Sequence, residues 1–203
     1  MKNNKFNAND YQVKIASPVG EAMWASLKDP KKWQPGDAGH YQMSLVVSKE
    51  EAQDLISQCT GVIEKMVHLI QDNETGRPTM SPHDPWKETE DGKIEFRFKK
   101  PHFEANDKYP ESTPVSTYLE DGSKVDWNAV DWGVGNGSIV KVGGFIRPYY
   151  VAAAGGLGVT LRLAAVKVFN LEKYRSGGED SFGFGNDAEA PETSDEATVD
   201  ADF

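Results

Sequence analysis

Three short stretches of the chain place aromatic rings beside Lys or Arg, a combination that suits a ligand both flat and negatively charged. They are LKDPKKW (residues 27–33), EFRFKKPHF (residues 95–103) and KVGGFIRPYY (residues 141–150). Aromatic rings stack on nucleobases, and cationic side chains follow the phosphates of a single strand with little need for particular hydrogen bonds. The three clusters are therefore candidates for a surface that holds a nucleic-acid strand.

In EFRFKKPHF, the alternation of a β-strand separates the rings from the cations. Successive side chains of a strand point to opposite faces, so Phe96 and Phe98 share one face while Arg97 and Lys99 share the other. We expect the two phenylalanines to be buried. Both cations are then left outward for phosphates.

In KVGGFIRPYY, the same alternation predicts an outward face that mixes cations and rings. Val140 and Val142 are expected to face inward. The opposite face then carries Lys141, Phe145, Arg147 and Tyr149. A β-bulge at residues 143–144 would reset this alternation.

The stretch LKDPKKW belongs to a connector rich in Pro and Gly, where a tryptophan is harder to explain by a core than in a strand. Packing of Trp33 across the mouth of a barrel is the alternative. With Lys14 added, the candidate nucleic-acid-binding residues are Lys14, Lys28, Lys31, Lys32, Trp33, Arg97, Lys99, Lys141, Phe145, Arg147 and Tyr149.

Catalysis has little support in the sequence. The four histidines are scattered without the i, i+4 spacing of a helical metal site, and there is no Cys-x-x-Cys. GVGNG and GGLG do not match the dinucleotide fingerprint, and no Ser stands in a nucleophile-elbow sequence. We therefore expect no enzymatic activity, with no catalytic residue, no metal and no cofactor.

The composition favours an intracellular protein. The single cysteine, Cys59, excludes an internal disulfide and is expected to be a small apolar residue in a helix. No apolar stretch approaches the ~20 residues of a membrane span, and residues 1–12 lack the apolar middle of a signal peptide. We expect a soluble, cytoplasmic protein without a membrane partner.

The net charge of −10 conceals a division of the chain. The last cation is Arg175, and nine of the 32 carboxylates lie beyond it, so residues 1–175 hold 23 acids against 22 bases. Residues 176–203 are acidic and poor in apolar side chains, which favours disorder. We therefore expect a folded domain at residues 1–175 and a disordered acidic tail at residues 176–203.

Apolar periodicity predicts five strands and one helix. The strands are expected at residues 11–27, 40–48, 93–100, 138–151 and 158–171, and the helix at residues 49–70. Pro18 and Gly20 mark a bend in the first strand, and residues 28–39 form a turn-rich connector within a hairpin. A shorter extended piece and an Asp121-Gly122 turn are expected between residues 113 and 127. Five or more strands with one helix suggest a small closed or partly open barrel.

The helix has a clear start. Ser48 is an N-cap with Glu51 three residues on, which is a capping box. Apolar residues from Ala52 to Ile70 recur at three- and four-residue steps, as in an amphipathic helix. Gly61 is the residue expected to weaken this helix, because glycine has a low helix propensity.

In this order of elements, the chain resembles the single-stranded DNA-binding proteins of tailed bacteriophages. The likeness rests on the strands and helix just described and on the terminal DEATVDADF, and it covers essentially the whole chain. It implies a mainly β fold: a five-stranded antiparallel OB-fold (oligonucleotide-binding) barrel with one helix between the second and third strands, followed by a disordered acidic C-terminal tail.

The resemblance also implies a function. Such a protein coats single-stranded DNA without marked sequence preference during phage DNA replication, recombination and repair, in the cytoplasm of an infected bacterium. Its tail docks on replication proteins such as DNA polymerase and competes with DNA for the groove, and a homodimer is compatible with it. Clustered carboxylates imitate phosphates, and a terminal ring fits an apolar pocket. The tail residues concerned are Asp195, Glu196, Asp200, Asp202 and Phe203.

Two other classes of function stay open at this point. One is a carbohydrate- or protein-binding β module whose rings stack on sugars and whose tail only solubilises it. The other is a nuclease that holds magnesium with Asp and Glu, although residues 1–175 contain no compact D-x-E or E-x-K arrangement that supports it.

Overall fold

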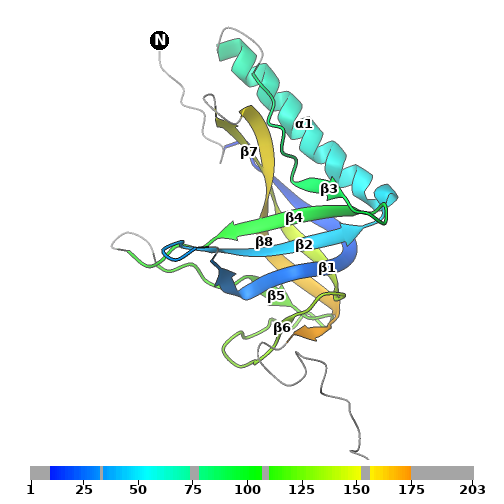
Figure 1. Ribbon diagram of the computed structural model, residues 1–203, viewed down its shortest axis with the longest axis vertical. Coiled ribbons are helices and arrows are strands. Elements are labelled where there is room, and N and C mark those ends of the chain that lie inside the picture. The colour runs from blue at the N-terminus through cyan, green and yellow to red at the C-terminus, as the bar shows by residue number, and fades with distance from the viewer. Residues whose placement is uncertain (1–9, 33, 74–77, 107–109, 152–155, 175–203) are drawn as a thin grey trace, which may run out of the picture.

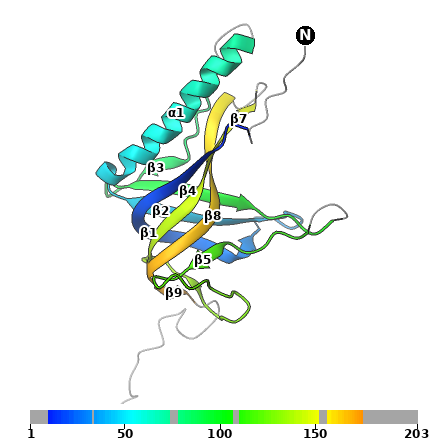
Figure 2. The ribbon, with the colours of Figure 1, turned by 180° about the vertical axis from the view of Figure 1, so that it is seen from behind.

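Five long strands wrap around one core into a closed barrel, and a long helix lies beside one end of it (Figures 1 and 2). The computed structural model describes residues 10–32, 34–73, 78–106, 110–151 and 156–174. In chain order the elements are β1 (Val13–Lys31), β2 (His40–Val47), α1 (Lys49–Asn73), β3 (Trp86–Glu88), β4 (Ile94–Pro101), β5 (Ser116–Tyr118), β6 (Gly133–Val134), β7 (Ile139–Val151), β8 (Gly156–Asn170) and β9 (Lys173–Tyr174).

Around the barrel the strands follow the order β1, β2, β4, β8 and β7, which returns to β1. The pairings are antiparallel except between β4 and β8, whose parallel pairing closes the ring. The helix α1 lies in the chain between the second and third strands of the ring, followed by the short β3. This topology confirms the predicted five-stranded OB-fold barrel.

The strand β1 bends so that it can pair with β7 and with β2. Its register with β7 shifts between Ala16 and Val19, and within this bulge Ser17 Oγ accepts a hydrogen bond from the backbone N–H of Val142 at 2.9 Å. At Gly20 a Cβ atom would lie only 2.4 Å from Val47 Cγ1, so only glycine lets the two backbones come this close. The bend predicted from Pro18 and Gly20 is confirmed.

The barrel interior is filled by every second residue of each strand. Phe96 and Phe98 of β4 are fully buried and face Leu45 and Met43 of β2 in register. This confirms the expected burial of the two phenylalanines. The one position between them, Arg97, consequently faces outward, and Lys99 follows on the same outer face of β4.

The helix α1 begins as the sequence predicts. Glu51 N–H donates to Ser48 Oγ at 3.3 Å, and Ser48 N–H donates to the Glu51 carboxylate at 3.2 Å, which is a reciprocal capping box. The helix continues through Gly61, and near its end Met66 packs against Leu157 of β8. In the described part of the chain, no helix is long and apolar enough to cross a membrane.

Cys59 is fully buried on the inner face of α1, as the sequence predicts. Burial raises the pKa of its thiol to about 12, with a smaller contribution from the charge of Asp84. The thiol therefore stays protonated at neutral pH and acts as a small apolar group.

The prediction for the end of the first strand is wrong. Lys28 and Lys31 belong to β1 and not to a connector, because β1 continues to pair with β2 as far as Lys31 opposite His40. The connector is therefore confined to residues 32–39. The Asp121-Gly122 turn is confirmed, since Gly122 has a φ of 85° and its N–H donates to the Leu119 carbonyl at 3.0 Å.

Candidate nucleic-acid interface

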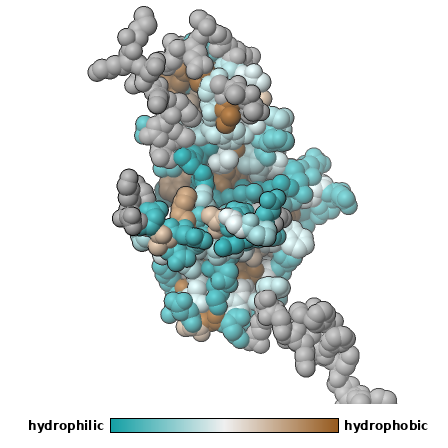
Figure 3. Space-filling model, turned by 60° about the vertical axis from the view of Figure 1, so that its left-hand side comes forward, coloured by the Kyte–Doolittle hydropathy of each residue, from teal (hydrophilic) through white to brown (hydrophobic). Residues whose placement is uncertain are grey.

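A groove of about 360 Å³ runs over the outer faces of β1, β2 and β4. It combines four cations and one tryptophan with a single carboxylate. Its outward-facing side chains are Trp24, Lys31, Gln42, Ser44, Lys87, Glu95, Arg97 and Lys99. On the side of the molecule seen in Figure 3, hydrophilic side chains cover most of the barrel, and hydrophobic ones are exposed only in small, separate areas.

The floor of the groove follows from strand alternation. In the pairing of β2 with β4, Gln42 lies opposite Lys99 and Ser44 lies opposite Arg97, all on the outer face. Arg97 and Lys99 are exposed, as the sequence predicts. The next cation, Lys100, instead donates from Nζ to the Thr113 carbonyl at 2.6 Å, and burial lowers its pKa.

Trp24 stands at the edge of this floor with 63% of its surface exposed. Its φ of 54° lies in the left-handed region, which is a genuine outlier for a bulky residue. The register of β1 against β2 shifts between Met23 and Ser26, so Trp24 occupies a β-bulge. Its backbone N–H donates to Asn136 Oδ1 at 2.8 Å, which holds the bulge from the turn before β7. The fold thus accepts backbone strain to expose an indole ring, a pattern found at binding sites.

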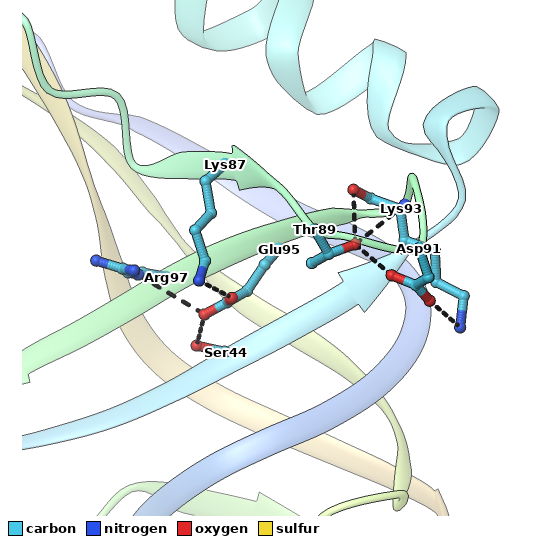
Figure 4. A network of polar contacts seen from close by, with 7 residues as sticks. All are labelled: Ser44, Lys87, Thr89, Asp91, Lys93, Glu95 and Arg97. Carbon is cyan, nitrogen blue, oxygen red and sulfur yellow. Dashed lines mark hydrogen bonds and ion pairs between the residues drawn. The ribbon is translucent and has the colours of Figure 1, made fainter.

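A carboxylate arranges the cations of the groove (Figure 4). Only 9% of the Glu95 surface is exposed, and its carboxylate pairs with Lys87 Nζ at 2.9 Å and with Arg97 Nε at 3.7 Å. It also accepts a hydrogen bond of 2.7 Å from Ser44 Oγ. Burial alone would raise the pKa of Glu95, but the hydrogen bonds from Lys87 and Ser44 and the two positive charges together lower it. In the free protein, one internal anion therefore occupies two cations that face the groove.

The turn between β3 and β4 holds Lys87 in this position (Figure 4). Thr89 N–H donates to the Lys93 carbonyl at 2.9 Å, and Thr89 Oγ1 hydrogen-bonds the Asp91 carboxylate. That hydrogen bond, aided by Lys93 at 3.4 Å, lowers the pKa of Asp91. The turn fixes the short β3 against β4, where Lys87 lies opposite Glu95.

The structure divides the cations of LKDPKKW. Lys31 lines the groove, whereas Nζ of Lys32 lies 4.0 Å from Oε1 of Glu104 and forms an ion pair with it. Lys28 donates from Nζ to the Val130 carbonyl at 2.7 Å and belongs to a different pocket, beside Trp132. Trp33 lies outside the described residues.

The residues predicted from KVGGFIRPYY do share one face. Every second residue of β7 from Val140 to Pro148 faces inward, without interruption. A bulge does occur opposite Gly143 and Gly144, but its extra residue is residue 164 of β8, so the alternation of β7 is not reset. The outer face of β7 therefore carries Lys141, Phe145, Arg147 and Tyr149. Lys14 of β1 lies opposite Phe145, and Tyr149 Oη donates to Ser81 Oγ at 2.7 Å.

The remaining candidates belong to the C-terminal part of the chain. The tail residues Asp195, Glu196, Asp200, Asp202 and Phe203 lie outside the described residues, as does the boundary at residue 175. Within the described ranges, no group of three or more His, Cys, Asp or Glu side chains could hold a metal ion.

Sequence reasoning missed the tryptophan of the groove and one of its four cations, together with the polar residues Gln42, Ser44 and Glu95. Trp24 falls within a strand that the sequence predicts to be regular there, because neither Gly nor Pro marks the bulge at residues 24–25. Lys87 lies in a segment with the composition of a loop, and only its pairing with β4 brings it to Glu95. The one signal in the sequence was the neighbouring Trp86, a large aromatic residue of the kind favoured in strands, which is half-buried against Phe96.

The barrel and its groove define an OB-fold protein, and comparisons with solved structures agree. T7 gp2.5, a single-stranded DNA-binding protein encoded by bacteriophage T7, is 20% identical with a TM-score of 0.65, over 93% of this chain and 100% of that chain. The single-stranded DNA-binding protein of bacteriophage Enc34, in complex with ssDNA, is 15% identical with a TM-score of 0.52. The likeness covers 83% of this chain and 90% of that chain. No protein-family model matches the chain, and no curated protein sequence matches it.

The left-handed conformation of Trp24 predicts an unusual order of stability between two variants. At an ordinary strand position glycine is about 0.5–1 kcal/mol less stable than alanine. At a left-handed position a Cβ atom is unfavourable by roughly 1–2 kcal/mol. We therefore expect W24G to exceed W24A in free energy of unfolding by about 1 kcal/mol, measured by urea denaturation. A more stable W24A would contradict the left-handed bulge.

Proposed function

We propose that this protein binds single-stranded DNA, without marked sequence preference, in the groove over β1, β2 and β4. The observation that carries the proposal is the exposed, strained Trp24 beside the cations Lys31, Arg97 and Lys99. A ring that stacks on any base and cations that meet successive phosphates are what sequence-independent single-strand binding requires. The shared fold of two phage proteins that bind single-stranded DNA supports the same assignment.

The geometry supports a separate role for each side chain of the groove. Trp24 stacks on a base, while Arg97 and Lys99 meet phosphates along β4. Lys87 joins them when the strand displaces it from Glu95. Lys32 and Trp33, which follow β1 in the chain, are proposed to continue the site into the connector.

The outer face of β1 and β7 is proposed as a continuation of the binding surface. It offers the cations Lys14, Lys141 and Arg147 and the rings of Phe145 and Tyr149. Lys28 is the exception among the candidates, because its amino group is bound to a backbone carbonyl away from the groove.

We further propose that the protein coats transient single strands during phage DNA replication, recombination and repair. In this proposal the tail at residues 176–203 docks on replication proteins such as DNA polymerase and competes with DNA for the groove. Its nine carboxylates and the aromatic ring of Phe203, on a chain whose first 175 residues are nearly neutral, support this. The phage origin of the proteins with the same fold also supports it.

Titration of tryptophan fluorescence with oligo-dT at two salt concentrations tests the proposed ligand. Contacts between cations and phosphates release counterions, so we expect the affinity to fall steeply as salt rises. W24A should weaken binding by roughly 1–3 kcal/mol, the value of one stacked base. The matched control Y118A removes an exposed ring on β5, outside the groove, and should bind as the wild type does. Binding that does not respond to salt would point instead to a ligand such as a carbohydrate.

The internal anion Glu95 leads to a gain-of-affinity prediction. E95Q keeps an acceptor for Ser44 but removes the charge that occupies Lys87 and Arg97. We expect DNA binding at low salt to tighten by about 1 kcal/mol, or roughly fivefold, and the gain to shrink as salt screens it. The control E88Q makes the same change of charge on β3, where Glu88 pairs with Lys49 at 2.7 Å. An equal gain in E88Q would reduce the effect to net charge alone.

Deletion of residues 190–203 tests the tail. Removing a covalently attached anionic competitor should strengthen oligo-dT binding at low salt and abolish binding to a replication partner in a pull-down with the phage or host DNA polymerase. Unchanged DNA affinity at low salt would refute the competition.

A further inference from the structure

The hairpin formed by β7 and β8 carries only positive charges, although the chain as a whole is acidic. Residues 139–151 and 156–170 contain no Asp or Glu, although the whole chain carries a net charge of −10. Their four cations are Lys141, Arg147, Arg162 and Lys167. The two strands of the hairpin therefore carry positive charge that no acid on the same strands balances.

Two of these cations meet on the outer face. Phe145 lies opposite Arg162, and Arg147 lies opposite Thr160. Arg147 and Arg162 are thus diagonal neighbours on adjacent antiparallel strands, within reach of each other's long side chains. Both project outward, because the residues on either side of each of them are buried.

The two arginines lack the partners that arginines at half-buried positions usually have. The Nε atoms of both are buried without a hydrogen-bond partner, and neither arginine pairs with a carboxylate among the described residues. Burial lowers the pKa of the Arg162 guanidinium, and the charge of Arg147 lowers it further. Two like charges kept together without a counter-charge are unfavourable unless a ligand supplies one.

The arginine pair is joined to the groove through a neighbouring strand. Across the parallel pairing of β4 with β8, Lys99 lies in register with Arg162. On the other side, Lys14 of β1 lies opposite Phe145. A row of outward side chains therefore runs from Lys99 in the groove through Arg162 and Phe145 to Lys14.

We propose that Arg147 and Arg162 form a phosphate clamp, which holds a phosphodiester group of the DNA strand after it leaves the groove past Lys99. A planar guanidinium donates two parallel hydrogen bonds to a phosphate, and two guanidinium groups side by side match one phosphodiester group from two directions. The ring of Phe145 lies beside the clamp for the adjoining sugar or base. This inference rests on the proposed function and adds to it a second site that determines how many nucleotides one protein covers.

The test compares short and long oligo-dT on the full chain. The variant R147Q/R162Q removes the clamp, and K65Q/K124Q removes two exposed cations from α1 and from the loop after β5. For an oligonucleotide of about 15 nucleotides, we expect the clamp variant to bind about tenfold more weakly than the wild type. Its slope of log affinity against log salt should fall by about 0.7 for each phosphate that the clamp no longer neutralises. A strand of about four nucleotides, which fills only the groove, should bind both variants and the wild type equally.

The outcomes separate the clamp from the proposed function. If R147Q/R162Q binds the long strand with wild-type affinity and slope while W24A is impaired, the clamp is wrong and the groove stands. If the wild type binds neither strand, the proposed function itself fails. An equal reduction of affinity in K65Q/K124Q would also overturn the clamp, because it would reduce the effect to net charge.

A conservative variant covers the case in which the double variant does not fold. R162K keeps the charge on β8 but removes the planar fork. We expect a threefold or larger reduction of affinity for the long strand at an unchanged melting temperature. Wild-type affinity in R162K would overturn the clamp.

Discussion

The architecture depends on the ability of one strand, β1, to hydrogen-bond with both β7 and β2. The bulge at Ser17 and the close approach allowed by Gly20 turn this strand from one neighbour to the other. Because β1 pairs on both sides, the sheet can close, and β4 meets β8 in a parallel pairing. Closure leaves each strand with one face in the core and one on the surface. Arg97 and Lys99 are outward for the same reason that Phe96 and Phe98 are buried.

The outer surface accepts electrostatic and steric penalties that the core does not need. Trp24 keeps a left-handed backbone, Glu95 is buried between two cations, and Arg147 and Arg162 lie together without a described counter-charge. Each of these is unfavourable or neutral for folding. Trp24 and Glu95 line the groove, and the arginine pair is joined to it through Lys99, so one anionic strand could stack on the ring and supply the counter-charge that the arginines lack. Under the proposed function, DNA binding and not stability is the physical reason for all three.

Net charge describes this protein poorly, because the charges are segregated. Nearly all of the excess of acids over bases lies beyond Arg175, whereas β7 and β8 carry cations alone. At physiological salt, exposed charges act over roughly 8 Å. A DNA strand bound in the groove, as we propose, would therefore respond to Lys31, Lys99 and their neighbours and not to the total of −10. Glu95 shows the same principle locally, because its carboxylate pairs with Lys87 and Arg97 and thereby reduces the positive charge that they offer to a ligand.

The strands, the capped helix and the outward direction of Arg97, Lys99 and Phe145 could be predicted from the residues, because alternation and capping are local properties of the chain. The five-stranded OB-fold barrel was implied by the family resemblance. The sequence by itself could not reveal the bulge that exposes Trp24, since the shift arises from pairing with β2 and no local residue marks it. It could not bring Lys87 to Glu95 or Lys99 to Arg162, because these pairs form only when separate strands come into register. The residue types that suit DNA were thus readable from the chain. Their arrangement into one continuous surface was decided by barrel closure, which joins segments distant in sequence.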